Sequence, residues 1–132
     1  MSKILIISKK KYNKSNYNIL KNNKNFIFLD NINLKKINKI KPRIIFFIFW
    51  SKKISENIFS KFLCIQFHSS DLPKFRGGSP IQNQILNNVY KTKLSAFKIN
   101  QKIDDGDICL KSNISLYGKA ENIYQTIEKK ST

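Results

Sequence analysis

Cysteine and histidine are scarce in this chain of 132 residues, which has two cysteines and one histidine. Cys64 and Cys109 lie far apart in apolar runs, and the sequence has no CxxC pair and no His-Cys cluster. Disulfide-stapled proteins need several paired cysteines, and zinc sites need three or four clustered ligands. We therefore expect neither, and we expect free thiols in a reducing, cytoplasmic compartment.

Long apolar runs and glycine-rich phosphate loops are also absent. The apolar stretch 44–50 is far shorter than a bilayer span, and the apolar run at the N-terminus is too short for a signal peptide. The four glycines form neither GxGxxG nor GxxxxGK[ST], so neither a dinucleotide site nor a P-loop is supported. The sequence predicts a soluble protein without membrane contact.

Acidic residues are few, with eight against 25 basic residues and a formal charge of +17. Two interpretations stay open. The charge indicates a nucleic-acid or anionic-membrane partner, or the excess of Lys, Asn and Ile reflects AT-rich codons. Only two basic residues are arginine, the residue that nucleic-acid sites favour for its bidentate fork, so we favour codon bias by roughly two to one. The charge still favours an anionic substrate such as a nucleotide-linked molecule.

Apolar and polar segments alternate along the chain. Apolar runs predict strands at 4–7, 26–29, 44–50, 63–67, 92–99 and 108–116, the last interrupted at Ser112 and Asn113. Helical spacing occurs at 32–40, 54–62, 81–89 and 120–130, and weakly at 9–25. Continuous apolar runs suit strands that are buried on both faces. The sequence therefore predicts one α/β domain with an open, mostly parallel, Rossmann-like sheet.

The stretch Phe67–Pro80 contains the only histidine, His68, with one of the two arginines and two of the four glycines. Gln66 and His68 lie two apart on a predicted strand and point to the same side, at the carboxyl end where open α/β sheets bind ligands. A lone histidine is more often structural than catalytic, so spacing alone leaves both roles open. Ser79 is expected to cap the next helix in a capping box with Gln82.

A second turn gathers three of the acidic residues, Asp104, Asp105 and Asp107, around Gly106. Their order does not follow the calcium-loop pattern, which needs acidic or amide residues at alternating positions before its glycine and a Glu after it. We therefore expect no metal. The turn is either a solvated bend or a carboxylate positioned near His68, and the residues alone leave both open.

Together these segments resemble a known family. The residues His68, Leu72-Pro73-x-x-Arg76-Gly77, Ser79-Pro80-Ile81-Gln82 and Ile103-Asp104-x-Gly106-Asp107-Ile108 look like those of formyltransferases that use 10-formyltetrahydrofolate, in order and spacing. That family includes methionyl-tRNA formyltransferase, glycinamide ribonucleotide transformylase and nucleotide-sugar N-formyltransferases. The resemblance covers about residues 44–127. It implies a catalytic domain over 1–132, with N-terminal strands in 1–50, a motif-bearing core in 51–132 and C-terminal truncation.

The resemblance implies roles for individual residues. The family's catalytic Asn-x-His and later aspartate are matched by Gln66, His68 and Asp104, with Gln66 in the asparagine position and longer by about 1.5 Å. The residues expected to bind folate are Trp50, Ser51, Lys52, Asn100, Gln101, Lys102 and Ile103, with core packing an equal alternative for Trp50. The residues expected to bind the acceptor are Ser69, Asp71, Lys74, Arg76, Gly77 and Gly78.

The details of the motifs look most like those of the sugar-formylating branch of the family. The segments that carry this likeness are Asp71-Leu72-Pro73, Arg76-Gly77-Gly78-Ser79-Pro80 and Phe49-Trp50-Ser51. The resemblance therefore implies formyl transfer from 10-formyltetrahydrofolate to the amine of a nucleotide-linked amino sugar. A methionyl-tRNA formyltransferase-like enzyme is the alternative, and a truncated, inactive remnant acting as a basic binding module is the third hypothesis. Nucleic acid is a less favoured partner, and a homodimer is left open.

Overall fold

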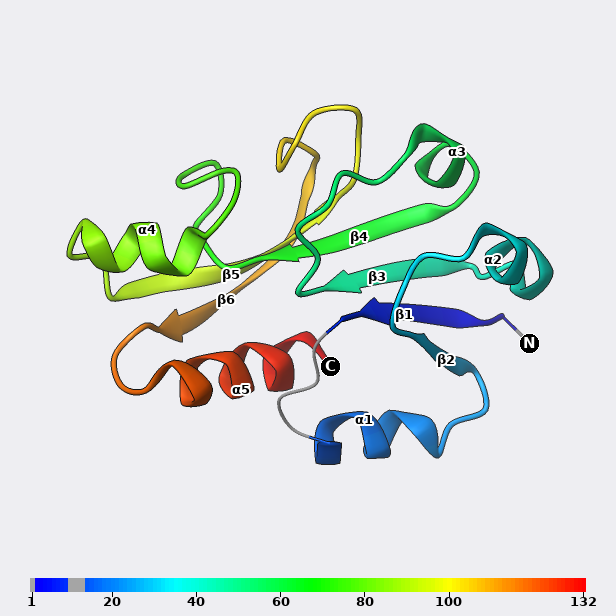
Figure 1. Cartoon of the computed structure of the whole chain (residues 1–132), viewed down its shortest axis with the longest axis horizontal. Helices are drawn as coiled ribbons and strands as arrows, with labels where there is room; N and C mark the ends of the chain where they lie inside the picture. Colours follow the sequence, from blue (N-terminus) through cyan, green and yellow to red (C-terminus); the bar gives the residue numbers. More distant parts are fainter. Residues whose placement is uncertain (1, 10–13) are drawn as a thin grey trace.

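The computed structural model describes residues 2–9 and 14–132, which form one six-stranded sheet with helices on both faces (Figure 1). The strands are β1 (Ile4–Ser8), β2 (Phe26–Leu29), β3 (Ile44–Ile48), β4 (Leu63–His68), β5 (Lys91–Lys98) and β6 (Ile108–Ser115). The helices are α1 (Lys14–Lys21), α2 (Leu34–Ile40), α3 (Glu56–Phe59), α4 (Pro80–Leu86) and α5 (Ala120–Ser131).

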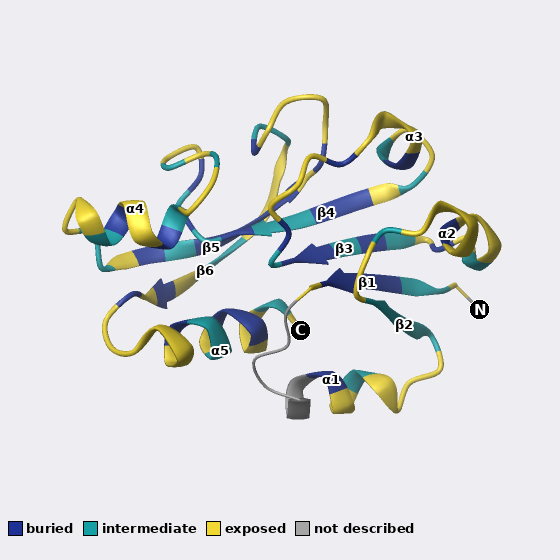
Figure 2. Cartoon of the chain, in the orientation of Figure 1, coloured by how far each residue is buried: buried dark blue, intermediate teal, exposed yellow. Residues whose placement is uncertain are grey.

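The strand order is β2-β1-β3-β4-β5-β6, with β1 to β4 parallel and β5 and β6 antiparallel. The open, mostly parallel sheet predicted from the apolar runs is thereby confirmed. The central strands bury apolar side chains on both faces, with Leu5 and Ile45 on one face and Ile6 and Ile48 on the other (Figure 2). Burial on both faces is why these strands read as continuous apolar runs instead of alternating ones.

The helices divide between the two faces of the sheet. Ile37 of α2 and Ile58 of α3 pack with Leu5, Ile45 and other residues of one face. Tyr17 of α1 packs with strand residues of the opposite face. The apolar stripes of α4 and α5 also pack with strands β5 and β6, in a separate cluster. The helices therefore bury the apolar stripes that the sequence shows.

Several local predictions were wrong. Strand β6 runs without interruption through Ser112 and Asn113, because every residue there pairs with β5. Helices α3 and α4 end earlier than predicted, at Phe59 and Leu86. Helix α1 begins at Lys14, and the first part of the helical spacing at 9–25 includes residues 10–13, which lie outside the described part of the chain.

The predicted capping box is absent from α4. Ser79 has φ 53° and ψ 48°, and its side chain makes no capping hydrogen bond. The left-handed backbone turns the hydroxyl away from the helix N–H groups, which an extended N-cap would reach. Gln82 instead donates from Nε2 to the Tyr124 hydroxyl on α5, at 3.2 Å. Proline does occupy the start of the helix, as predicted.

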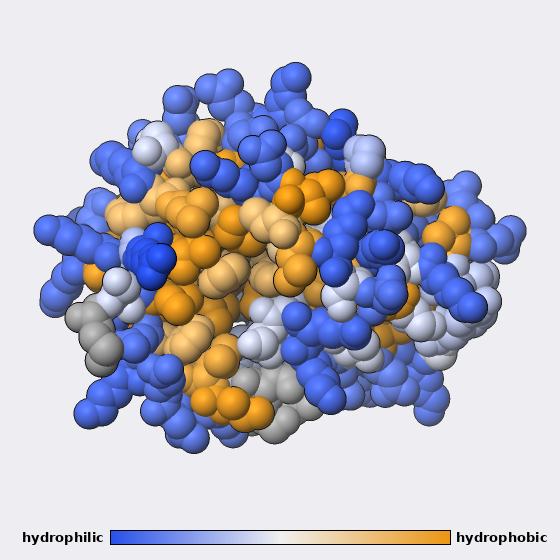
Figure 3. Space-filling model, turned by 180° about the vertical axis from the view of Figure 1, so that it is seen from behind, coloured by the Kyte–Doolittle hydropathy of each residue, from blue (hydrophilic) through white to orange (hydrophobic). Residues whose placement is uncertain are grey.

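One side of the molecule carries a broad apolar area (Figure 3). Large apolar side chains that are exposed on strands include Leu63 on β4 and Leu110 on β6, at 42% and 67%. Both lie on the same face of the sheet. Leu110 pairs with Ala96 of β5, and Ala96 pairs with Phe67 of β4. Phe67 is on the same face of β4 as Leu63, because residues an even number of positions apart in a strand point to the same side. Among the described residues, no helix has the length and hydrophobicity that a membrane span requires.

Candidate active site

The main cavity lies at the carboxyl ends of β1, β3 and β4, and its volume is about 460 Å³. Strand order reverses between β1 and β3, because β2 lies on one side of β1 while β3 and β4 continue on the other. Open α/β sheets bind ligands at such a switch point, where loops diverge and leave a crevice. The loop after β3 and the segment Asn100–Asp104 form further parts of its wall.

His68 ends strand β4 and is 6% exposed at the edge of the cavity. Its Nε2 lies 2.7 Å from the carbonyl oxygen of Phe75. A carbonyl oxygen can only accept, so Nε2 carries a proton and donates it. Nδ1 faces Oδ2 of Asp104 at 3.5 Å. In the neutral ring Nδ1 is therefore the unprotonated nitrogen, directed toward a carboxylate.

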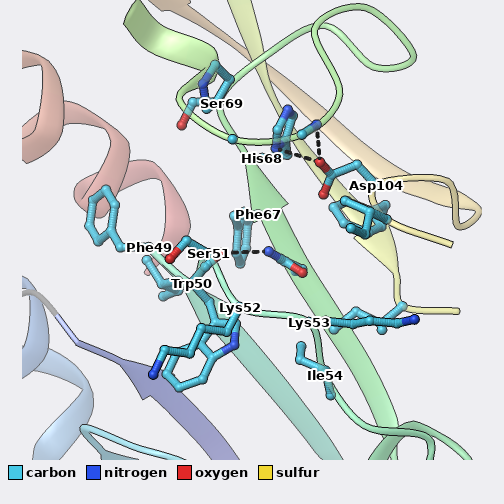
Figure 4. A pocket seen from close by; sticks show the side chains of 18 of the residues that line it. Phe49, Trp50, Ser51, Lys52, Lys53, Ile54, Phe67, His68, Ser69 and Asp104 are labelled. Atoms are coloured by element: carbon cyan, nitrogen blue, oxygen red, sulfur yellow. Dashed lines mark hydrogen bonds and ion pairs between the residues drawn. The ribbon is translucent and has the colours of Figure 1, made fainter. Parts of the chain in front are cut away.

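Asp104 is 8% exposed and is held in place through its backbone and its carboxylate. Its Oδ2 accepts a hydrogen bond from the backbone N–H of Gly77 at 2.7 Å. Its φ of 52° is in the left-handed region, which aspartate tolerates better than most residues. Figure 4 shows the carboxylate directed at His68. Two hydrogen-bond acceptors thus face each other at 3.5 Å, so a proton taken up by Nδ1 would be stabilised by the Asp104 carboxylate.

Gln66 lines the same cavity two residues before His68. Its Nε2 donates to the carbonyl oxygen of Trp50 at 2.8 Å. The contact fixes the orientation of the amide, because only the nitrogen can donate to a carbonyl. The second N–H of Nε2 is not used by this bond. Gln66, which stands where the resemblance implies asparagine, is thus bound to the loop after β3.

The loop after His68 is tied to two neighbouring elements. The hydroxyl of Ser95 on β5 donates to the Ser70 carbonyl at 2.6 Å and accepts from the N–H of Leu72 at 3.3 Å. The Nε2 of Gln84 on α4 donates to the Ser69 carbonyl at 2.7 Å. The Leu72–Pro73 peptide is cis. These bonds hold the backbone that carries Phe75 and Gly77, the two partners of the catalytic candidates.

The structure brings together most of the predicted site residues. The cavity lining includes all three catalytic candidates, all seven folate candidates and three of the six acceptor candidates: Gln66, His68, Asp104, Trp50, Ser51, Lys52, Asn100, Gln101, Lys102, Ile103, Ser69, Gly77 and Gly78. Trp50 is 6% exposed and packs with Phe47 at 5.7 Å between ring centroids, as core packing predicts, and it also lines the cavity, where its folate contact stays a prediction. The individual roles stay predictions.

The other three acceptor candidates, Asp71, Lys74 and Arg76, lie outside the cavity lining. Asp71 pairs with Lys111 of β6 at 2.5 Å, and this hydrogen bond lowers the pKa of the Asp71 carboxyl. Arg76 pairs with Asp105 at 2.6 Å. Both ion pairs connect the loop after β4 to other segments. The structure therefore gives Asp71 and Arg76 contacts that hold the loop in place.

Sequence reasoning missed three contributors. The Phe75 carbonyl fixes the tautomer of His68, and no sequence pattern reports a backbone acceptor. Tyr124 of α5 lines the cavity and binds Gln82, a contact between segments far apart in the chain. Lys9 also lines the cavity. It directly follows β1, and its place at the carboxyl end of a predicted parallel strand could have identified it.

Comparisons with known proteins give a consistent result. Residues 5–131 match the family described as Formyl transferase. The methionyl-tRNA formyltransferase of Kosmotoga olearia is 31% identical over 96 residues, covering 71% of this chain and 30% of that protein. That of Ehrlichia canis is 34% identical over 98 residues, covering 73% and 32%. The chain thus spans about a third of the length of these curated relatives.

Solved structures agree on the fold. Methionyl-tRNA formyltransferase from Clostridium thermocellum gives a TM-score of 0.90 at 38% identity, over 98% of this chain and 60% of that chain. A 4-N formyltransferase from Francisella tularensis gives 0.75 at 18% identity, over 98% and 64%. HypX from Aquifex aeolicus in complex with tetrahydrofolic acid gives 0.73 at 16% identity, over 86% and 21%. The last two likenesses are of fold alone.

Proposed function

The chain belongs to the formyl transferase family, and we propose that it transfers a formyl group from 10-formyltetrahydrofolate to the α-amine of methionyl-tRNA. The observation that carries this proposal is the buried pair of His68 and Asp104 at the cavity, with Nδ1 and Oδ2 at 3.5 Å. An amine nucleophile must lose a proton during acyl transfer, and this pair is arranged to receive one.

The sequence motifs ranked a nucleotide-linked amino sugar as the first acceptor and methionyl-tRNA as the second, and the proposed acceptor reverses this order. The similar sequences from Kosmotoga and Ehrlichia, and the similar structure from Clostridium, are methionyl-tRNA formyltransferases. The Francisella enzyme supports only the shared fold, at 18% identity. A nucleotide-linked amino sugar remains the second candidate, because the motif Asp71-Leu72-Pro73 resembles that of the sugar-formylating branch. The excess of basic residues also suits a polyanionic acceptor. A cytoplasmic location stays a prediction.

The cavity fits the proposed formyl donor. A volume of about 460 Å³ lies within the range of cofactor sites. The loop after β3 and residues Asn100–Ile103 line the cavity, and polar groups of these segments would suit a pterin ring. When bound, 10-formyltetrahydrofolate supplies the formyl carbon that the amine attacks.

His68 is the proposed proton acceptor. Its Nε2–H is held by the Phe75 carbonyl, so the unprotonated Nδ1 is the basic nitrogen. Once Nδ1 has taken a proton from the amine, the imidazolium faces the carboxylate of Asp104 at 3.5 Å. The carboxylate of Asp104 stabilises the positive charge of the imidazolium, and the backbone N–H of Gly77 holds that carboxylate in place. A positioned general base of this kind contributes roughly 100- to 10,000-fold in rate.

Gln66 is the proposed oxyanion donor. Its Nε2 donates one N–H to Trp50, which leaves the second N–H for the formyl oxygen as negative charge develops. One well-aimed donor of this type is worth about 100- to 1,000-fold in rate. In the complete reaction, a bond forms between the acceptor nitrogen and the formyl carbon, and the bond from that carbon to the donor nitrogen breaks. The proton held by His68 goes to the leaving nitrogen.

The proposal is tested by mass spectrometry of the products formed with 10-formyltetrahydrofolate. One reaction contains methionyl-tRNA, and the other contains a panel of UDP- and dTDP-linked amino sugars. We expect N-formylmethionyl-tRNA, and we expect the His68→Gln variant to lose about 100-fold or more of the rate. Thermal unfolding of the variant checks that it remains folded.

Formylated sugar without formylated tRNA would transfer the assignment to the second candidate. Failure to formylate either acceptor, by a protein that unfolds cooperatively, would contradict the proposal. An unchanged rate in His68→Gln would remove His68 from the mechanism.

A further inference from the structure

The segment 75–77 of the loop after β4 contacts both members of the catalytic pair. The carbonyl oxygen of Phe75 accepts from Nε2 of His68, and the N–H of Gly77 donates to Oδ2 of Asp104, each at 2.7 Å. The distance of 3.5 Å between Nδ1 and Oδ2 therefore depends on two backbone groups of one short segment. A displacement of this segment relative to the acidic turn would change both contacts together.

The middle residue of the segment connects it to the acidic turn. The guanidinium of Arg76 pairs with Oδ1 of Asp105 at 2.6 Å, and Asp105 directly follows Asp104 in the chain. The two side chains are 47% and 29% exposed, and both lie outside the cavity lining. The ion pair is thus a second connection between the same two segments, beside the hydrogen bond from Gly77 to Asp104.

The backbone of both segments needs such a restraint. Phe75 has φ 55° and Asp104 has φ 52°. Both values lie in the left-handed region, which a bulky residue such as phenylalanine rarely adopts. Conformations of this kind are unfavourable by themselves and persist only where surrounding contacts fix them. Arg76 and Asp105 directly follow these two residues, so their ion pair restrains the chain next to each strained position.

We propose that Arg76 and Asp105 are positioning residues, whose ion pair fixes the acidic turn against the loop after β4 and thereby orients the catalytic pair. The proposal rests on the proposed function, because it concerns the same pair. It gives Arg76 a role different from the acceptor contact that the sequence motifs imply. An isolated, half-exposed ion pair adds little to global stability, so we expect its effect on the geometry of the site and thus on the rate.

A contact between Arg76 and an anionic acceptor is the competing explanation, and charge distinguishes the two. Arg76→Gln removes a positive charge, whereas Asp105→Asn removes a negative one. If Arg76 attracts the acceptor, these two changes have opposite effects on the KM for the acceptor. If the ion pair positions the site, both changes break the same contact, and both lower kcat.

The first experiment is a double-mutant cycle on formyl transfer. We expect Arg76→Gln and Asp105→Asn each to lower kcat about tenfold. This is less than the roughly 100-fold that a displacement of about 1 Å can cost, because the backbone bonds of Phe75 and Gly77 remain. The KM values for the acceptor and the folate donor should stay unchanged. The double variant should lose no more than either single variant, since all three lack the same contact.

Arg43→Gln is the matched control. Arg43 is the only other arginine, it is exposed, and it directly precedes β3, at the end of that strand away from the cavity. Its variant should keep the kcat of the wild type, and urea unfolding checks that every variant is folded. An equal loss in the control, losses that multiply in the double variant, or KM changes of opposite direction in Arg76→Gln and Asp105→Asn would overturn the proposal.

The second experiment observes the site without turnover. His68 is the only histidine, so nitrogen NMR of the isotope-labelled, neutral imidazole reports the tautomer of this residue alone. In the wild type we expect the proton on Nε2, where the Phe75 carbonyl holds it. In Arg76→Gln and Asp105→Asn the signals of the two ring nitrogens should move toward each other, as the second tautomer becomes populated. Ring signals that stay as in the wild type would contradict the positioning role.

The two proposals fail separately. A change of tautomer in the two ion-pair variants, in a protein that formylates neither acceptor, would keep the coupling between the ion pair and His68 and contradict the function. Formyl transfer at the wild-type kcat in both variants would keep the function and overturn the positioning role.

Discussion

Replacing Gly106 with alanine tests whether backbone packing behind the acidic turn positions Asp104. A Cβ at position 106 would lie 1.5 Å from the carbonyl oxygen of Lys98 and 2.7 Å from its carbonyl carbon, whereas ordinary contact begins at 3.4 Å. Relieving the closer contact takes a movement of about 1.9 Å, the difference between 3.4 and 1.5 Å. Lys98 is fixed in strand β5, and its N–H also binds the Asp107 carbonyl at 2.8 Å. The turn must therefore move.

That movement is large compared with the geometry of the site. Oδ2 of Asp104 lies 3.5 Å from Nδ1 of His68 and 2.7 Å from the N–H nitrogen of Gly77. A displacement of about 1 Å at a catalytic group can cost roughly 100-fold in rate. We expect Gly106→Ala to lose at least that much formyl transfer. Overpacking should also lower the free energy of unfolding by about 1–3 kcal/mol.

The assay combines urea unfolding with the rate of formyl transfer. Gly78→Ala is the matched control for stability, because a Cβ there meets nothing within 4 Å. Its free energy of unfolding should stay within about 0.5 kcal/mol of the wild type. The reasoning would be refuted by a Gly106→Ala protein with the urea midpoint and the formyl-transfer rate of the wild type.

Three further predictions concern charge and titration. Asp104→Asn keeps an acceptor for the backbone N–H of Gly77 but removes the negative charge that stabilises the His68 imidazolium. We expect kcat to fall about 100-fold or more while the free energy of unfolding stays unchanged. A normal kcat would contradict this role of Asp104. Burial raises the pKa of Cys64 to about 12, while Cys109 is exposed, so a thiol reagent at pH 8 should modify one cysteine in the folded protein and two in denaturant. Lys111 lowers the pKa of Asp71 in the folded state. The ion pair therefore stabilises the folded protein at pH values above the pKa of Asp71 in the unfolded chain, which is about 3.9. This stabilisation is lost as the pH falls through the lower pKa that Asp71 has in the folded protein. Lys111→Ala should therefore cost about 0.2–1 kcal/mol at pH 6 and almost nothing at pH 2, and an equal cost at both pH values would contradict the ion-pair account.

The strands of the sheet could be predicted from the sequence because their signal is local. Runs such as Ile4–Ile7 and Ile44–Ile48 are apolar at every position, which suits burial on both faces of a parallel sheet. Boundaries were less predictable, as at Ser79. Its backbone enters the left-handed region, so a sequence that reads as a capping box forms none. The conformation of the preceding loop decided that outcome.

The candidate site divides in the same way. The sequence by itself determined the residue types and their order: His68 at a strand end, an acidic turn one helix and one strand later, and glutamine at the position where the family resemblance implies asparagine. Only the tertiary structure decided which atoms meet. The tautomer of His68 depends on the Phe75 carbonyl, and the amide of Gln66 is oriented by the Trp50 carbonyl, neither of which a sequence pattern encodes. Lys9 and Lys52 are far apart in the chain and line the same cavity because β1 and β3 are adjacent in the sheet.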